Sequence, residues 1–409
     1  MYSDVVERLL KYVKIDSPSD RLSDKFPSTD SQVEFAKKLV EELKEVGVQD
    51  VVYDNYYIIA TIPANTKNVP SLAFVTHYDV CTDAPATGIK PRIIENYDGG
   101  EILFPADEKL KLNSEVDPRL AACKGHTLIL TDGSTLLGAD CKAGIALSIE
   151  LAKFLLENPD YPHGMIRFII GPDEELGVSI TKLDISKSRC DYGYTLDGPQ
   201  YAKVWTECFN ADKVTVNVKG MAAFPGRGQK QFTDASQMLC EMLAKVPLKY
   251  DPYYADGRDG IMWIQMMKGK MDKASAMVMV RDFDINKLEE MEEMIRGFAN
   301  GVLAKYPNGE IDIEVKELYR NYKVELDKRP EVVENALEAF RRIGVKPEIG
   351  VTRGGNDCTH LCEKGIISAH ISIGYNLCHS VREWISIQQL EKNLEMVKEL
   401  PKVWVEKSS

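Results

Sequence analysis

Helix and strand patterns alternate along the first half of the 409-residue chain, and this alternation constrains its fold more than any other feature. Short apolar strands and amphipathic helices follow one another, with strands predicted at 71–77, 165–170 and 192–196 and helices at 1–13, 31–46 and 141–157. Ser31 and Glu34 fit a capping box at the start of the second helix, and Gly47 is placed to end it. Such alternation predicts an α/β fold built on a mostly parallel mixed sheet.

The pattern changes near residue 211 and returns after residue 326. The segment between predicts the order β-α-β-β-α-β, with strands at 213–218, 260–268, 275–281 and 311–319 and helices at 234–246 and 285–305. This order describes a small two-layer domain. The last segment predicts α/β structure again, with helices at 330–343, 358–364 and 388–402 and a strand at 366–373. We therefore expect a catalytic domain of residues 1–207 and 325–409, with a second domain, residues 208–324, inserted into it.

Charge and cysteine content exclude several classes of protein. The net charge is −12, from 51 basic and 63 acidic side chains, which argues against nucleic acids and anionic membranes as partners. The chain lacks an apolar run of about 18 residues, and its N-terminus predicts an amphipathic helix rather than a signal peptide. Nine cysteines at irregular spacing, without a Cys-x-x-Cys pair, indicate reduced thiols. We expect a cytoplasmic protein that binds neither nucleic acid nor membrane.

Acids and histidines stand just after several predicted strands or at a helix start. The group comprises His77, Asp79, Asp140, Glu174, Glu175, Asp197 and His379. Because the carboxyl ends of strands in an open α/β sheet meet at one crevice, these side chains can converge. Histidines with carboxylates suit zinc, and a pair of ions needs one bridging carboxylate and another left free as a base. Glu174 and Glu175 can divide these roles, and Asp79 can orient His77. The competing interpretation is that such acids are helix caps or turn residues.

With these residues the chain resembles the peptidase T family of zinc-dependent exopeptidases and aminoacylases. The resemblance extends nearly end to end and rests on Thr76-His-Tyr-Asp79, Asp132-Gly-Ser-Thr-Leu-Leu-Gly-Ala-Asp140, Lys142-Ala-Gly144, Pro172-Asp-Glu-Glu175, Asp197-Gly198, Arg281-Asp-Phe-Asp284, Arg353-Gly-Gly355 and Gly374-Tyr-Asn376 before His379. It implies a two-zinc aminopeptidase that releases the N-terminal residue from tripeptides or other short peptides. A metal-activated water molecule is expected to attack the peptide bond.

The resemblance also implies how the metal ligands divide. One zinc ion is expected on His77, Asp140 and Asp197, and the other on Asp140, Glu175 and His379, so that Asp140 bridges the two. Glu174 is expected to be the general base that activates the water, and Asp79 the residue that orients His77. The peptide bond between Asp140 and Cys141 is expected to be cis.

The inserted domain is expected, on the same resemblance, to act as a lid and as the surface of a homodimer. Arg281 on that domain is expected to help hold the substrate at its carboxylate end. Arg353 and Asn376 are further candidate substrate-binding residues. The remaining histidines lack motif context and are predicted to be structural; they are His126, His163, His360 and His370.

Two positions depart from the family's pattern. Cys141 stands where the family has a second aspartate that is not a ligand, so zinc binding should survive, although a thiol there can coordinate or oxidise. Phe224 replaces the histidine of a lid His-Pro-Gly motif, a residue thought to stabilise the tetrahedral intermediate. Losing such a donor costs roughly 10²–10³ in turnover. Arg227 is the nearest cationic candidate to replace it.

These departures leave two alternatives beside the tripeptide aminopeptidase. One is a di-zinc amidohydrolase, deacylase or dipeptidase acting on another small amide. The other is a catalytically weak peptide-binding relative, because the lid histidine is absent. The sequence lacks Gly-x-Ser-x-Gly, His-Glu-x-x-His and Walker motifs, so serine-hydrolase, single-zinc and nucleotide-binding interpretations have no support.

Overall fold

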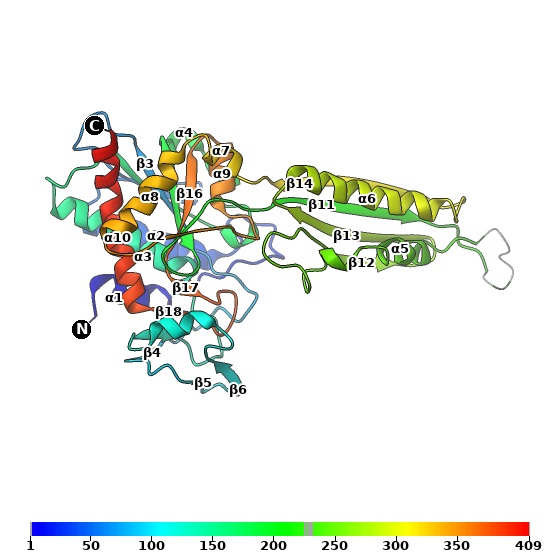
Figure 1. The fold of residues 1–409 in the computed structure, drawn as a ribbon, viewed down its shortest axis with the longest axis horizontal. Coiled ribbons are helices and arrows are strands. Elements are labelled where there is room, and N and C mark those ends of the chain that lie inside the picture. Colours follow the sequence, from blue (N-terminus) through cyan, green and yellow to red (C-terminus); the bar gives the residue numbers. More distant parts are fainter. Residues whose placement is uncertain (1, 225, 227–231, 409) are drawn as a thin grey trace. The chain divides into compact units, whose positions relative to one another are not determined.

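The computed structural model describes residues 2–224, 226 and 232–408. By their internal contacts these residues form two compact units. The first contains Met1–Thr206, Tyr322–Val351 and Asn356–Ser409, and the second contains Glu207–Asn321 and Thr352–Gly355. The segment Thr352–Gly355 groups with the second unit, whereas the sequence analysis assigned it to the catalytic domain. Figure 1 shows that each unit is built on its own sheet.

An eight-stranded sheet forms the centre of the first unit. In spatial order its strands are β1 (Asp50–Asp54), β2 (Tyr57–Ile62), β8 (Ile166–Gly171), β3 (Leu72–His77), β9 (Tyr192–Gly198), β16 (Ile367–Ser372), β10 (Lys203–Trp205) and β15 (Glu348–Gly350). The neighbours β8, β3, β9 and β16 are parallel, while β1 with β2, β2 with β8 and β16 with β10 are antiparallel. The predicted mixed sheet with a parallel centre is confirmed.

The helices of the first unit are α1 (Asp4–Tyr12), α2 (Asp30–Val46), α3 (Ala139–Glu157), α4 (Ile185–Ser188), α7 (Lys323–Leu326), α8 (Pro330–Arg342), α9 (Asp357–Glu363) and α10 (Ile387–Ser408). Gly47 ends α2 in the left-handed region, with φ 108°, as predicted. The predicted capping box of Ser31 and Glu34 is wrong, because Thr29 is the N-cap and Glu34 pairs with Lys37 at 2.7 Å.

Alternate side chains of the central strands pack on opposite faces of the sheet. Phe74 stacks against Phe168 and Tyr194 on one face, where Tyr194 donates to a carbonyl of α8 and accepts from Trp404 of α10. The other face buries Val75 with Leu361 of α9. The sheet is thus covered on both sides, and its strand ends remain the place where polar side chains can gather.

A smaller sheet fixes the loop that carries one of the two candidate histidine ligands. Its strands, in spatial order, are β17 (Tyr375–Asn376), β18 (Trp384–Ser386), β7 (Leu128–Leu130) and β4 (Arg92–Ile94), and a hairpin of β5 (Ile102–Phe104) and β6 (Asp107–Leu112) lies in the same unit. Buried Trp384 packs with Phe104 and Leu130. His379 lies in the loop between β17 and β18, so this packing positions it. Short 3₁₀ helices occur at Pro118–Cys123, Glu174–Leu176, Ile180–Lys182 and, in the second unit, Leu248–Tyr250.

The second unit is a four-stranded antiparallel sheet with two helices. Its strands, in spatial order, are β12 (Ile261–Gly269), β13 (Lys273–Asp282), β11 (Asn210–Lys219) and β14 (Glu310–Tyr319), and its helices are α5 (Ala235–Leu243) and α6 (Ile285–Leu303). Val214, Val216 and Val218 alternate along β11 and are buried with apolar side chains of both helices. The chain order β-α-β-β-α-β is as predicted. Among the described residues, we find no helix long and apolar enough to cross a membrane.

Candidate metal centre

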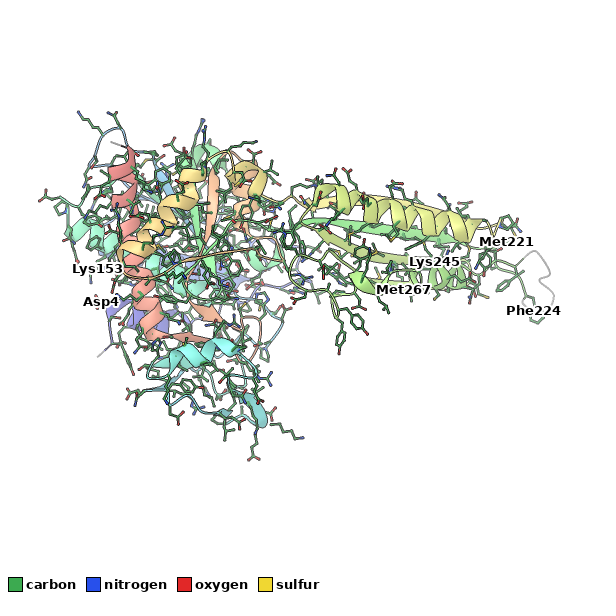
Figure 2. All side chains as sticks on the ribbon, in the orientation of Figure 1. Asp4, Lys153, Met221, Phe224, Lys245 and Met267 are labelled. Atoms are coloured by element: carbon green, nitrogen blue, oxygen red, sulfur yellow. The ribbon has the colours of Figure 1, made fainter. Side chains whose placement is uncertain are left out.

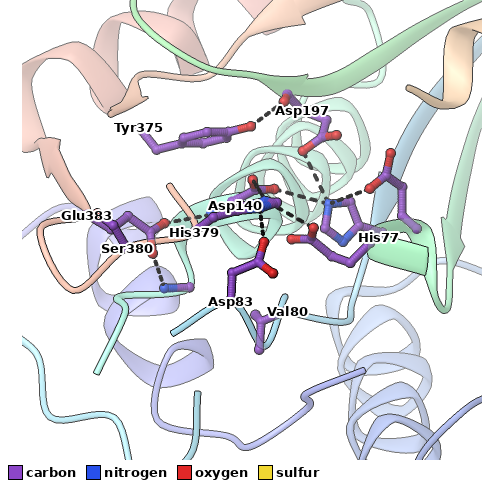
Figure 3. Close-up of polar contacts among 12 residues, drawn as sticks. His77, Val80, Asp83, Asp140, Asp197, Tyr375, His379, Ser380 and Glu383 are labelled. Carbon is purple, nitrogen blue, oxygen red and sulfur yellow. Dashed lines mark hydrogen bonds and ion pairs between the residues drawn. The ribbon is translucent and has the colours of Figure 1, made fainter. Parts of the chain in front are cut away.

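The predicted acids and histidines of the first unit meet where the parallel strands end. His77 is the last residue of β3, Asp197 lies near the end of β9, and Glu174 follows β8 in a short 3₁₀ helix. These strands are neighbours, with β3 paired to both β8 and β9, so their carboxyl ends lie at one edge of the sheet. Asp140 joins them from the start of α3, and His379 from its loop (Figure 3).

His77 lies at the centre of one half of the cluster. Its Nε2 is 3.2 Å from Asp140 Oδ1, 3.3 Å from Asp197 Oδ1 and 3.9 Å from Glu174 Oε2. Its Nδ1 lies 3.3 Å from the Asp79 carboxylate and 3.1 Å from the Asp79 carbonyl oxygen. The ring is therefore held from behind by Asp79 and presents Nε2 to three carboxylates.

His379 forms the other half. Its Nε2 lies 3.0 Å from Glu175 Oε2 and 3.5 Å from Asp140 Oδ2, and its Nδ1 lies 3.0 Å from Asp83 Oδ2. Asp140 is therefore shared: its Oδ1 faces His77 and its Oδ2 faces His379. The expected cis peptide between Asp140 and Cys141 is present.

Asp79 joins the two halves through the backbone. Its two carboxylate oxygens accept from the N–H groups of Glu174 and Glu175, at 3.0 and 3.2 Å. The same buried carboxylate thus fixes both the His77 ring and the turn that carries two adjacent glutamates. Glu174 is directed to the His77 side and Glu175 to the His379 side.

Burial and mutual repulsion raise the pKa of several of these acids. Burial raises the pKa of Glu174 well above its usual value and that of Glu175 to about 7, and it also raises the pKa of Asp197. Burial alone would lower the pKa of His77, but Asp197 and Asp140 outweigh it and raise that pKa well above its usual value. The cluster carries more negative charge than its histidines offset, and cations would correct this excess.

The donor set fits metal ions, and zinc in particular. Glu175 Oε1 is buried without a hydrogen-bond partner among the described residues, and a buried oxygen in a native protein normally has one. Side-chain donors of His77, Asp140 and Glu175 lie within 4.8 Å of one another. Imidazole nitrogens with carboxylate oxygens are typical zinc ligands.

Sequence reasoning missed three residues that support these side chains. The Oδ2 atom of Asp83 lies 3.0 Å from Nδ1 of His379. The other carboxylate oxygen of Asp83 forms an ion pair with Arg21 at 3.0 Å. The Tyr375 hydroxyl donates to the Asp197 carbonyl at 2.7 Å. Buried Glu383 accepts from backbone N–H groups of the turn that leads into Asp140. Asp83 comes four residues after Asp79, but in the sequence alone nothing distinguishes it from a surface acid.

Replacing Glu383 with glutamine should weaken metal binding by about 10–100-fold, as is usual when a residue that positions a metal ligand is lost. Glu383 accepts three N–H bonds at 2.8, 2.7 and 3.1 Å, from Leu137, Gly138 and Asp140. A glutamine side chain has only one oxygen, and its NH₂ group cannot accept a hydrogen bond from a backbone N–H group. The turn that holds Asp140 must therefore shift. Competition with a chelating dye measures the affinity. Exposed Glu45→Gln is the control, and equal affinities in both variants would contradict the role of Glu383.

Arg281 and Arg353, which the sequence analysis predicts to bind substrate, belong to the second unit. In the second unit, Arg281 lies over the rings of Trp263 and Tyr319, at 5.1 and 5.8 Å, and its buried Nε has no hydrogen-bond partner among the described residues. Arg353 donates to the carbonyls of Ala255 and Asp259 at 3.0 and 3.1 Å. Arg353 therefore stabilises the loop of residues 255–259 in its own unit. The sequence analysis did not predict this role.

Asn376, in β17 of the first unit, is buried; its Nδ2 donates to the Gly374 carbonyl at 3.0 Å, while Oδ1 has no partner among the described residues. Phe224 is 73% exposed at one end of the second unit (Figure 2). Pro225 and Arg227, which the sequence analysis also considered, lie outside the described residues. His370 is buried and faces Asn356 at 2.9 Å through Nδ1.

Comparisons with known proteins agree on one family. Residues 135–402 match the model of peptidase family M20/M25/M40. Peptidase T of Geobacillus thermodenitrificans is 34% identical and peptidase T of a Geobacillus species (strain WCH70) 36% identical, each with complete coverage of both chains. Aminopeptidase PepT from Bacillus cereus and a tripeptidase from Staphylococcus aureus share the fold, with a TM-score of 0.77, 24% and 20% identity and 98% of each chain covered.

Proposed function

This chain belongs to peptidase family M20/M25/M40, among relatives named peptidase T, and we propose that it is a two-zinc tripeptide aminopeptidase acting through the His77–His379 cluster. The metal-dependent aminopeptidase activity follows from the family. The identity of the metal as zinc, the number of ions and the role of each residue are our proposal. A solved neighbour of the same fold is described as a dinuclear metal-binding peptidase of the M20 family.

One observation carries the proposal: Asp140 directs one oxygen to each imidazole. A carboxylate so placed is suited to bridge two ions. His77 and Asp197 would complete one position, and His379 and Glu175 the other. Both positions would then have three protein donors, as in catalytic zinc sites that keep an open place.

Glu174 is the proposed general base. It lies outside both donor sets, yet its Oε2 is only 3.9 Å from His77 Nε2. Held by His77, His379 and the neighbouring carboxylates, zinc ions would supply Lewis acidity that makes a water molecule easier to deprotonate. Glu174 would take the proton of that water and pass it to the leaving amine. Burial raises the pKa of Glu174 well above its usual value, which makes its carboxylate a stronger base.

Asp79 would act by position rather than by touching the substrate. Its carboxylate fixes the tautomer and orientation of His77 and holds the Glu174 backbone at the same time. Asp83 would do the same for His379. Arg281, Arg353 and Asn376 are proposed to bind the substrate, with Arg281 at its carboxylate end. The unpartnered Nε of Arg281 and Oδ1 of Asn376 support this for those two residues.

The second unit is proposed as the lid and as the surface of a homodimer. Its edge strand β12 exposes Ile264, Met266 and Met267, which are 43, 40 and 51% exposed, and exposed apolar edge strands favour pairing with another chain. Sedimentation velocity should give a dimer at micromolar concentration. A monomer throughout that range, or a dimer unchanged when Met267 is replaced by glutamate, would contradict this arrangement.

We also propose that the enzyme works in the cytoplasm on short peptides. Cys81, Cys141 and Cys378 form no disulfide bond in the described structure, which suits a reducing compartment. Neither nucleic acid nor membrane is a proposed partner, consistent with the net charge of −12.

A substrate panel separates this function from the alternatives. Zinc-loaded protein is offered a tripeptide with a free N-terminus, its N-acetylated form, a dipeptide and an N-acylated amino acid. We expect the free tripeptide to be hydrolysed fastest and the acylated substrates to be inert. Faster hydrolysis of an acylated amino acid would establish a deacylase, and tight tripeptide binding without turnover would establish a peptide-binding protein.

A further inference from the structure

Three thiols border the candidate metal centre. Cys81 forms a group with Glu175 and His379, Cys378 with Asp140 and His379, and Cys141 with His77 and Asp197. Within each group all potential ligand atoms lie within 4.8 Å of one another. Two of the three thiols therefore lie on the His379 side of the centre.

Cys141 and Cys81 differ in what surrounds their sulfur atoms. Cys141 donates to the Leu196 carbonyl at 3.0 Å and is wholly buried between α3 and the sheet. Its sulfur lies 2.8 Å from the position that a Cβ on Gly144 would take, so Cys141 packs closely against Gly144. Cys81, by contrast, is 2% exposed, and its sulfur lies within 4.8 Å of ligand atoms of Glu175 and His379.

The Cys81 group also contains an unsatisfied donor atom. The Glu175 side chain is 5% exposed, and its Oε1 has no hydrogen-bond partner among the described residues. Its Oε2 lies 3.0 Å from His379 Nε2. A nitrogen, a carboxylate and a sulfur thus converge beside a buried carboxylate oxygen that lacks a partner.

We propose that Cys81 is an additional, sulfur ligand of the ion at the His379 position, which would make that position selective for thiophilic divalent ions. The inference rests on the proposed function, since it assumes that this position holds an ion. Zinc bonds are about 2.3 Å to sulfur and about 2.0–2.2 Å to nitrogen and oxygen, so two ligands of one tetrahedral ion lie about 3.3–3.6 Å apart. The Cys81, Glu175 and His379 ligand atoms lie within 4.8 Å of one another, so the side chains would close on the ion as it binds.

The chemistry of such a ligand follows from its acidity. Only the thiolate form of a cysteine binds metal. Metal binding would therefore displace the thiol proton to solvent while the sulfur–metal bond forms. Soft sulfur favours zinc, cobalt and cadmium over magnesium and manganese, which prefer oxygen donors. The two halves of the centre would then differ, with the His77 half holding only nitrogen and oxygen donors.

Cobalt titration of the metal-free protein tests this assignment. Cobalt(II) bound by a thiolate shows a sulfur-to-metal charge-transfer band in the near ultraviolet, which histidine and carboxylate ligands do not produce. We expect this band in the unaltered protein and its loss in Cys81→Ser. Cys378→Ser, Cys141→Ser and, in a distant part of the first unit, Cys123→Ser should keep it. We also expect Cys81→Ser to lower cadmium affinity at one position more than about tenfold.

The outcomes distinguish this inference from the function on which it rests. Cobalt bound with visible ligand-field bands but no charge-transfer band would overturn the sulfur ligand and leave the peptidase unaffected. A band that disappears with Cys378→Ser or Cys141→Ser instead would assign it to another thiol and overturn the role of Cys81. Failure to bind cobalt or zinc at all would overturn both proposals.

A variant-free measurement covers the case in which Cys81→Ser folds poorly. The X-ray absorption spectrum of the zinc-loaded wild-type protein should show a zinc–sulfur distance of about 2.3 Å. Because only one of the two zinc ions would bind sulfur, the fit should give on average half a sulfur ligand for each zinc ion. A first shell of nitrogen and oxygen alone would contradict the proposal.

Discussion

Replacing Glu174 with glutamine should lower kcat/KM for a tripeptide by about 10²–10⁴-fold, the usual contribution of a general base. The amide has nearly the shape of the carboxylate but cannot take a proton. Glu174 lies in neither proposed donor set, and its Oε2 approaches His77 Nε2 only to 3.9 Å. The loss should therefore appear in kcat, while the number of bound ions stays at two. Steady-state kinetics and metal analysis of the same sample measure both quantities.

Exposed Glu108→Gln, on the β5–β6 hairpin, is the matched control. It has the same chemistry of substitution and lies outside the cluster, so turnover should be unchanged. If Glu174→Gln kept wild-type turnover, the base would have to be another group. If it instead lost one of the two ions, Glu174 would be a ligand and the division between Glu174 and Glu175 would be reversed.

Replacing Asp140 with asparagine should affect both metal positions and reduce turnover below detection. Asp140 is the residue whose oxygens face both imidazoles, at 3.2 Å from His77 Nε2 and 3.5 Å from His379 Nε2. An amide keeps one carbonyl oxygen and turns an NH₂ group to the other ion, so it cannot bridge. We expect zinc affinity to fall at both positions, by more than about 100-fold.

Asp197→Asn is the comparison that makes this result informative. Asp197 faces only His77, at 3.3 Å, so its replacement should weaken one position and leave the His379 position filled. Isothermal titration calorimetry of the metal-free variants measures this difference. Asp140→Asn should lose tight binding at both positions, and Asp197→Asn at one position only. Two ions bound to Asp140→Asn with unchanged affinity would contradict a bridging role.

The long helices and strands could be predicted because burial leaves a periodic trace. In α6 the buried residues Leu288, Met291, Ile295, Ala299 and Val302 follow at intervals of three and four. Strand β2 was missed because all six of its residues are buried, and a short continuous apolar run does not distinguish strand from helix. Strands of two or three residues, such as β17 and β18, are too short for any period to show.

The meeting of the site residues could also be predicted, because parallel strands bring their carboxyl ends together. How the ligands divide could not be derived from position alone, since Glu174 and Glu175 are adjacent and chemically alike; the family resemblance supplied that division. The supporting bonds of Glu383 and Asp79 were hidden because they run to backbone N–H groups of distant turns. Such contacts depend on loop geometry, which leaves no pattern in side-chain type.

Product analysis with one tripeptide of three different residues tests the central claim most directly. Zinc-loaded protein is incubated with the peptide, and mass spectrometry identifies the fragments as they form. The account predicts the free first residue together with the dipeptide of residues two and three, in equal amounts from the earliest time point. Release of the third residue, or an intact peptide in the presence of two bound zinc ions per chain, would contradict it.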